Sequence, residues 1–179
     1  PLAKGMNSEY CNQNAYDCIQ VHGGSGFMME YFCQQIYRDA RITSIYEGTT
    51  QLQTVAGIRC VTNGTYMSVI RDYEAIPVAE EYEGYMRRIK EMASKLEAVT
   101  NAVKDANDQE LLDFCARKLY EMTAYTIMCH LLLQDTQKAP EMFAASLNVF
   151  VNHAESEAEK HFNYIRKMDA AQLANYRKA

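Results

Sequence analysis

The second half of the chain repeats apolar residues with the spacing of an α-helix, and this constrains the fold more than any other feature. Apolar residues recur every three or four positions through three long stretches. No stretch alternates apolar and polar residues as a half-buried strand would. The chain contains only 3 prolines and 8 glycines, so little interrupts the helical patterns. We therefore expect an all-α fold.

Three long amphipathic helices are expected after Pro77, which is itself well suited to the first position of a helix. Asp108 can cap the second of them, and Pro140 can begin the third. Short connections between long amphipathic helices make neighbours antiparallel. The apolar faces span residues 82–103, 111–133 and 143–165. Residues 77–179 should therefore form an antiparallel helical bundle.

The first half predicts shorter helices that are separated by glycine-rich or polar turns. A helix from Leu2 to His22 should end at Gly23-Gly24, because glycine commonly follows the last helical residue. After a tight GGSGF turn, we expect a short helix at 29–38, a loop at 39–48 and a helix from about 49 to 63–64.

A domain boundary is expected between Asn63 and Pro77, where the sequence suggests a connection or a continued irregular helix. The predicted domains are residues 1–64 and 77–179. Because the chain begins with Pro1 and enters helical sequence at once, we also expect a piece of a longer polypeptide.

Composition and charge exclude several functions. The formal net charge of -5 argues against nucleic-acid binding, which usually requires a basic stripe. No apolar run is long enough to cross a bilayer, and no signal-peptide pattern is present. The 6 cysteines form no CxxC pair and follow no disulfide-scaffold spacing, so we expect mostly buried free thiols in a reducing compartment. A cytoplasmic location follows, with the mitochondrial matrix as the alternative.

One segment, YRDARITSIYEGTTQLQ, combines an acid with a predicted helix start. It places Glu47 directly before Gly48, Thr49 and Thr50. Threonine is a favoured helix cap, and the first N–H groups of a helix can bind an oxyanion or a phosphate. A base beside such donors is what the enolisation of a carbonyl compound requires. A solvated acid that interacts with the helix dipole would show the same local pattern.

Two blocks together resemble the acyl-CoA dehydrogenase family. They are QVHGGSGF, residues 20–27, and YRDARITSIYEGTTQLQ, residues 37–53, and they match in residue type, order and separation. The resemblance covers residues 1–64. It implies that these residues are helices of the family's C-terminal bundle, and that the second half is the additional C-terminal helical domain of some longer members.

The resemblance also implies site residues and a role in fatty acid metabolism. Glu47 would be the catalytic base, removing the alpha proton of an acyl-CoA while the beta hydrogen passes as hydride to FAD and leaves trans-2-enoyl-CoA. Tyr46 and Gly48 would line the acyl-CoA channel, with Ile45 adding to its apolar wall. The FAD contacts would be Thr49, Thr50 and Gln51 and, toward the FAD of a neighbouring subunit, Gln20, Val21, His22, Gly23 and Gly24.

Further expectations concern the loop, the partners and the activity. Arg38, Asp39 and Arg41 should form a salt-bridged turn below Glu47. His22 stands where the family usually has an apolar residue. The resemblance implies an electron-transferring flavoprotein as electron acceptor and a homo-oligomer, either a dimer or a tetramer. This chain alone should be inactive, because most of the flavin-ring site would lie upstream.

Alternatives remain open from the sequence. The chain could be a helical oligomerisation module without chemistry, or part of an acyl-CoA oxidase-like flavoprotein. A nitroalkane oxidase would use an aspartate as its base, so Glu47 argues against it. His153, Glu157 and His161 recur every four residues on one expected helix, but a solvated helix face is the commoner explanation, and we predict no metal site.

Overall fold

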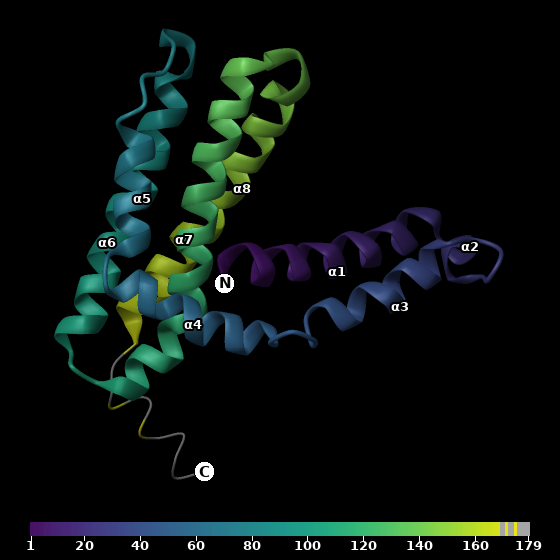
Figure 1. Cartoon of the computed structure of the whole chain (residues 1–179), viewed down its shortest axis with the longest axis horizontal. Coiled ribbons are helices and arrows are strands. Elements are labelled where there is room, and N and C mark those ends of the chain that lie inside the picture. The colour runs from purple at the N-terminus through teal and green to yellow at the C-terminus, as the bar shows by residue number, and fades with distance from the viewer. Residues whose placement is uncertain (169–170, 172–173, 175–179) are drawn as a thin grey trace. The chain divides into compact units, whose positions relative to one another are not determined.

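The computed structural model describes residues 1–168, 171 and 174 (Figure 1). Within them the chain is helical and contains no strand, which confirms the all-α prediction. The elements are α1 (Leu2–His22), α2 (Gly24–Phe27), α3 (Cys33–Thr43), α4 (Thr50–Thr62), α5 (Thr65–Glu74), the 3₁₀ turn η1 (Glu80–Tyr82), α6 (Glu83–Asp105), α7 (Gln109–Lys138) and α8 (Pro140–Lys167).

The chain divides into two compact units, Pro1–Gly57 and Ile58–Ala179. The division falls within α4, whereas the sequence places a boundary between residues 63 and 77. Because most of that interval is the regular helix α5, it does not have the character of a linker. The assignment of domains to 1–64 and 77–179 stays a prediction.

The first unit begins as the sequence predicts and then departs from it. Helix α1 has the expected bounds, and Gly23 ends it with φ 60, a left-handed conformation that favours glycine. The GGSGF turn contains the short helix α2. The predicted helix at 29–38 and loop at 39–48 are wrong, because α3 begins at Cys33 and continues to Thr43.

Packing explains why α3 is displaced from its predicted position. Helices α1 and α3 lie side by side (Figure 1), and α3 buries Cys33 and Ala40, two turns apart on one face. Asn12 Nδ2 of α1 donates a hydrogen bond to the Ala40 carbonyl at 3.1 Å. Contacts with α1 therefore stabilise the helical conformation of residues 39–43, whose local sequence suggests a loop.

The first unit leaves many apolar side chains in solvent around α2 and the turn that follows it. Val21 is 84% exposed and Met29 is 87% exposed, and Phe27 and Phe32 are also mostly exposed. Contiguous exposed apolar surface usually marks a contact with another surface. This unit therefore offers an apolar surface for packing at the α1–α3 turn.

The second unit is an antiparallel bundle whose central helix is α7, which packs against α5, α6 and α8 (Figure 1). Asp108 Oδ1 accepts hydrogen bonds from the N–H groups of Glu110 and Leu111, so it caps α7 as predicted. Because α7 has neighbours on several sides, even its polar threonines are buried. Its fully buried residues are Cys115, Leu119, Tyr120, Met122, Thr123, Thr126, Cys129, His130, Leu133 and Thr136.

Charged side chains fix the alignment of α6 with α8. Arg88 donates to Glu155 Oε2 at 2.6 Å and to the Asn152 side chain at 2.7 Å. Two turns further along α6, Lys95 pairs with Glu159. Partly exposed pairs of this kind contribute little stability, on the order of 1 kcal/mol or less each. The two pairs lie two turns apart on α6 and about one turn apart on α8, and together they favour one alignment of the two helices over a slipped one.

His130 is a buried titratable group on α7. Its side chain is fully buried, it stacks on Tyr73 with ring centroids 5.7 Å apart, and neither ring nitrogen has a hydrogen-bond partner among the described residues. Burial lowers the pKa of His130 from 6.5 to about 4, and the nearby charge of Glu74 offsets this only in part. His130 is therefore neutral in the folded protein near neutral pH.

The buried histidine makes the fold sensitive to acid. The unfolded chain binds a proton at His130 near pH 6.5, whereas the folded chain binds it only near pH 4, so stability falls as the pH drops through this window. The shift corresponds to about 3 kcal/mol, and the loss should stop below the folded pKa. Urea unfolding followed by circular dichroism at several pH values should show a shallower decline for His130→Leu. The control His153→Leu, at an exposed site, should follow the wild type; parallel curves for wild type and His130→Leu would refute the assignment.

Candidate functional site

The loop between α3 and α4 has an unusual backbone. Glu47 has φ 51 and Gly48 has φ 92, so two consecutive residues are left-handed. For a residue other than glycine this conformation costs roughly 1–3 kcal/mol, and such strain tends to occur at functional sites. Glu47 is exposed. Its conformation must therefore be imposed by the surrounding hydrogen bonds, not by burial of its side chain.

One polar face of α1 holds this loop. Lys4 Nζ donates to the carbonyls of Thr43 and Gly48 at 2.7 and 2.8 Å. Ser8 Oγ donates to the same Thr43 carbonyl at 2.9 Å, and Asn12 donates to a carbonyl in the last turn of α3. The three side chains are four residues apart and lie on one helix face. Sequence reasoning missed them, although polar residues at that spacing near the start of α1 are a recognisable signal.

The start of α4 is capped as the sequence predicts. Thr49 Oγ1 accepts a hydrogen bond from the Leu52 N–H at 3.2 Å, which is the geometry of a helix N-cap. Thr50 Oγ1 donates to Glu9 Oε1 at 2.6 Å, which connects α4 to α1. Gln53 Nε2 donates to the carbonyl of Glu47 at 3.3 Å. The strained loop is therefore bonded both to α1 and to the first turn of the following helix.

The predicted FAD contacts on this loop line a groove of about 580 Å³ in the first unit. Tyr46, Glu47 and Gly48 are not among its described lining residues, so the predicted base and channel residues lie outside this groove. The lining residues are Glu9, Asn12, Gln13, Tyr16, Tyr37, Arg41, Ser44, Ile45, Thr49, Thr50 and Gln51.

The predicted residues at the end of α1 lie apart from the loop. Gln20 is three turns of α1 beyond Glu9, or about 16 Å at about 1.5 Å per residue. The structure therefore groups Gln20, Val21, His22, Gly23 and Gly24 together, but separately from Thr49, Thr50 and Gln51. The expectation that the two groups contact different FAD molecules stays a prediction.

The three glycines of the GGSGF turn have different surroundings. Gly23 is left-handed, and a Cβ on Gly26 would lie 2.8 Å from the Ile19 carbonyl oxygen, so the fold requires glycine at both positions. Gly24 is exposed, has no positive φ and would have open space around a Cβ. The fold itself does not require glycine at position 24.

Two expectations about the loop need correction. Arg38, Asp39 and Arg41 lie on α3 and form no ion pair within the described residues; Arg41 instead donates to Ser44 Oγ at 2.6 Å. The apolar wall around Glu47 is also open, because Ile45 is 46% and Tyr46 is 50% exposed. The described residues alone do not enclose the predicted base.

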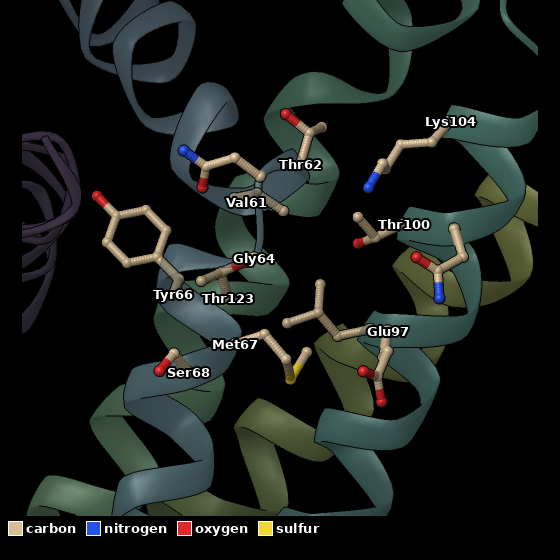
Figure 2. A pocket seen from close by; sticks show the side chains of 13 residues that line it. Val61, Thr62, Gly64, Tyr66, Met67, Ser68, Glu97, Thr100, Lys104 and Thr123 are labelled. Atoms are coloured by element: carbon tan, nitrogen blue, oxygen red, sulfur yellow. The ribbon is translucent and has the colours of Figure 1, made fainter.

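The second unit contains a cavity of about 220 Å³ at the turn between α4 and α5 (Figure 2). Thr100, Glu97 and Lys104 of α6 face this turn in Figure 2. The buried Thr100 hydroxyl has no hydrogen-bond partner among the described residues, and a single bound water would satisfy it. The cavity contains no pairing of a nucleophile or carboxylate with a base that would indicate catalysis.

The evenly spaced groups on α8 have different partners. His161 is buried, and its Nε2 lies 3.0 Å from Glu121 Oε2 of α7, whereas His153 packs edge-on against the Tyr125 ring. Burial raises the pKa of Glu121, but hydrogen bonds and charge from His161 and Arg117 outweigh this and lower it overall. The Glu121 carboxylate is therefore held charged between two basic side chains, a structural role.

Family models match nearly the whole chain. Residues 62–173 match "Acyl-CoA dehydrogenase C terminal", and residues 1–59 match "Acyl-CoA dehydrogenase, C-terminal domain". The chain belongs to the acyl-CoA dehydrogenase family, as the two sequence blocks predict.

Curated relatives match short stretches of the chain. Over 52 residues the chain is 46% identical to the caffeyl-CoA reductase-Etf complex subunit CarC of Acetobacterium woodii, covering 29% of this chain and 14% of that protein. Over 53 residues it is 51% identical to the 3-methylmercaptopropionyl-CoA dehydrogenase of Ruegeria pomeroyi, covering 30% of this chain and 9% of that protein. The chain therefore spans only a small part of the length of these relatives.

Solved structures of the family also resemble the chain. An acyl-CoA dehydrogenase family protein from Porphyromonas gingivalis is 36% identical with a TM-score of 0.60, over 64% of this chain and 98% of the solved one. An acyl-CoA dehydrogenase complexed with FAD from Bacillus anthracis has a TM-score of 0.74 at 20% identity, over 99% of this chain and 34% of the solved one, and supports the fold. Among the described residues, no helix has the length and apolar character needed to span a membrane.

Replacing Lys4 should loosen the Glu47 loop. Lys4→Met keeps an apolar stem but removes the donor to two carbonyls, and a hydrogen bond to a charged group contributes about 1.5–3 kcal/mol. Amide hydrogen exchange at Tyr46 and Thr50 should therefore accelerate roughly tenfold or more. Lys104→Met, at an exposed lysine on α6, is the matched control and should leave these amides unchanged. Unchanged exchange in Lys4→Met would mean that other contacts hold the loop.

Proposed function

We propose that this chain is the C-terminal part of an FAD-dependent acyl-CoA dehydrogenase and that it carries the catalytic base, Glu47. The observation that carries the proposal is the geometry of Glu47, an exposed carboxylate held in a strained conformation by contacts from α1 and α4. Its backbone N–H has no hydrogen-bond partner within the described residues. One residue thus offers both a base and a donor.

The proposed reaction uses both groups. The Glu47 carboxylate takes the alpha proton of the acyl-CoA, and the Glu47 N–H donates to the thioester carbonyl, where negative charge develops. Tyr46 and Gly48 line the acyl channel beside it. FAD, held by the residues described below, would supply the acceptor for the beta hydrogen, which would leave a trans-2-enoyl-CoA as product. Because Glu47 is open to solvent in this chain, other surfaces of the complete enzyme must exclude water from it.

The proposed FAD contacts fit the local chemistry. Thr49, Thr50 and Gln51 line the groove in the first unit. At the other end of α1, the backbone at Gly23 and Gly24 is open to a close approach, alongside Gln20, Val21 and His22. The FAD complex named for the Bacillus anthracis protein of the same fold supports this cofactor.

The proposed partners follow from the same surfaces and relatives. The Acetobacterium woodii relative is named as a subunit of an Etf complex, which supports an electron-transferring flavoprotein as electron acceptor. The apolar side chains exposed around α2, among them Phe27, Met29 and Phe32, support packing against another subunit or domain. We propose a homo-oligomer, and we expect this chain alone to be inactive.

A helical module without chemistry is the second candidate. The Porphyromonas gingivalis structure is covered by this chain over 98% of its length, so nearly all of that solved chain corresponds to part of this one. This candidate predicts that substitution of Glu47 in the complete enzyme leaves flavin reduction unchanged.

Glu47→Gln in the complete enzyme should abolish flavin reduction but not acyl-CoA binding. The amide keeps size and hydrogen bonding but cannot accept the alpha proton, and loss of a general base costs roughly 10²–10⁴-fold. We expect a loss near or above the upper end, and partial activity for Glu47→Asp, whose carboxylate is held farther from the proton. Stopped-flow bleaching of FAD at saturating acyl-CoA measures both.

The matched control is Glu91→Gln, which removes an exposed carboxylate on α6 and should behave as wild type. Bleaching by Glu47→Gln within about tenfold of wild type would show that another residue is the base, because a loss that small lies below the range for a general base.

Gly24→Ala should separate cofactor binding from folding. Position 24 tolerates a Cβ in the fold, so thermal stability should hold, while FAD affinity of the complete enzyme should fall if backbone meets cofactor there. Gly84→Ala, at another open position, should affect neither apart from a small helix stabilisation. Equal FAD affinity in Gly24→Ala and wild type would remove Gly24 from the cofactor site.

A further inference from the structure

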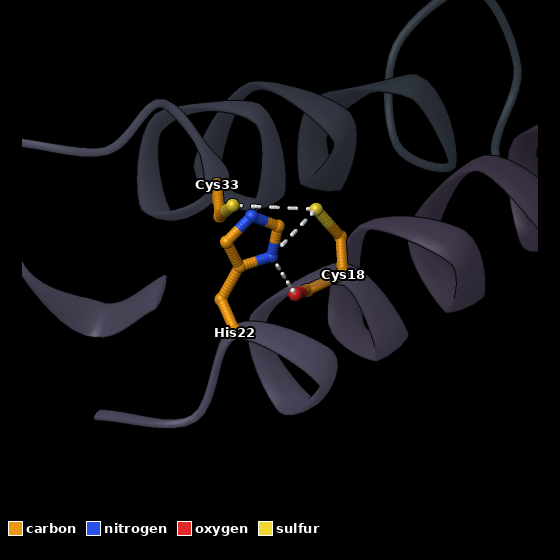
Figure 3. Close-up of side chains that lie close together, drawn as sticks. All are labelled: Cys18, His22 and Cys33. Carbon is orange, nitrogen blue, oxygen red and sulfur yellow. Dashed lines mark hydrogen bonds between the residues drawn. The ribbon is translucent and has the colours of Figure 1, made fainter. Parts of the chain in front are cut away.

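Three potential metal ligands converge where α1 ends and α3 begins (Figure 3). Cys18 Sγ lies 3.3 Å from Cys33 Sγ and 3.9 Å from His22 Nδ1, and one ligand atom from each residue lies within 4.8 Å of the others. Within the described residues, this is the one group of at least three His, Cys, Asp or Glu side chains close enough to share a metal ion.

The fold brings these residues together through the glycine turn. Cys18 and His22 are one turn apart on α1 and therefore lie on the same helix face. The chain then reverses through Gly23 and Gly26, and Cys33 is the first residue of α3. The sequence signal was weak because no CxxC or HxxxH pattern spans the turn.

The His22 ring is oriented as a metal ligand usually is. Its Nδ1 lies 2.9 Å from the Cys18 carbonyl oxygen, so an Nδ1–H can donate to that carbonyl. With the proton on Nδ1, the lone pair is on Nε2. Histidines that bind metals characteristically donate their other ring N–H to a carbonyl or carboxylate, which fixes the tautomer. Figure 3 shows the ring facing both sulfurs.

We propose that Cys18, His22 and Cys33 bind a Zn²⁺ ion, with a water molecule in the fourth position. Two thiolates and an imidazole suit zinc, which prefers tetrahedral sulfur and nitrogen ligands at about 2.3 and about 2.0–2.1 Å. Two sulfurs at that distance from one tetrahedral ion lie about 3.8 Å apart, so the Cys18–Cys33 pair needs to open by only about half an ångström.

Burial and access agree with such a site. Cys33 is buried, Cys18 is half-buried and His22 is exposed, so one side of the cluster is open for the ion and its water to enter. On binding, each thiol releases its proton to solvent, and the ion bonds to both sulfurs and to the imidazole nitrogen. The ion would tie the end of α1 to the start of α3, a role beyond the proposed acyl-CoA chemistry.

Metal titration of the purified full chain, kept reduced, tests the site. Competition for Zn²⁺ with a chromophoric chelator should give one ion per chain, and Co²⁺ should show thiolate charge-transfer absorption. Cys18→Ser, Cys33→Ser and His22→Gln should each weaken binding by at least about 100-fold, because even loss of an outer partner costs about 10–100-fold. The control Cys11→Ser removes an exposed thiol of the same helix and should bind as wild type.

The change in melting temperature on addition of Zn²⁺ distinguishes loss of the metal site from poor folding of a variant. Zn²⁺ should raise the melting temperature of wild type and Cys11→Ser but not of Cys33→Ser, with circular dichroism reporting the starting helix content. Wild-type binding retained in Cys18→Ser, or no stoichiometric binding by wild type, would overturn the proposal. So would a Cys18–Cys33 disulfide that forms with glutathione disulfide while added Zn²⁺ neither binds nor protects the thiols.

Discussion

The ammonium group of Lys4 is the contact on which the candidate site depends. It reaches the carbonyls of Thr43 and Gly48 from one half-buried side chain, and so joins the end of α3 to the left-handed residue after Glu47. A charged donor stabilises more than a neutral one, because a hydrogen bond from an ionised group is roughly twice as strong, and Lys4 donates to two carbonyls. These two hydrogen bonds help to offset the strain of the left-handed backbone at Glu47.

Helix α1 acts as a scaffold at both of its ends. Near its start, a polar face bonds the loop that carries Glu47; near its end, Cys18 and His22 face the first residue of α3. The hydrogen bond between Asn12 and α3 lies between these two regions. Both groups of candidate residues are thus held by contacts with one helix, which suits sites whose geometry must be maintained.

The helix ends that depend on a local glycine or capping side chain could be predicted from the sequence. The end of α1 follows from Gly23, the start of α4 from the Thr49 cap and the start of α7 from Asp108. The bounds of α3 could not be predicted, because its last turn depends on packing and hydrogen bonding with α1. The donors on α1 and the Cys18–His22–Cys33 cluster were missed for a related reason: each requires the chain to fold back on itself. The proposed role of Glu47 rests on family resemblance, and the geometry adds its left-handed backbone and an N–H without a partner among the described residues.

The three glycines of the turn differ in what a substitution at each would reveal. Any chain that keeps this reversal between α1 and α3 needs Gly23 for its backbone angle and Gly26 for its close approach to Ile19, whether or not a ligand binds. Gly24 has neither a positive φ nor a close neighbour, so neither requirement applies at position 24. If Gly24 contacts the cofactor as proposed, a descendant that kept the turn and lost the cofactor could accept a larger side chain at position 24, while Gly23 and Gly26 would still have to be glycine.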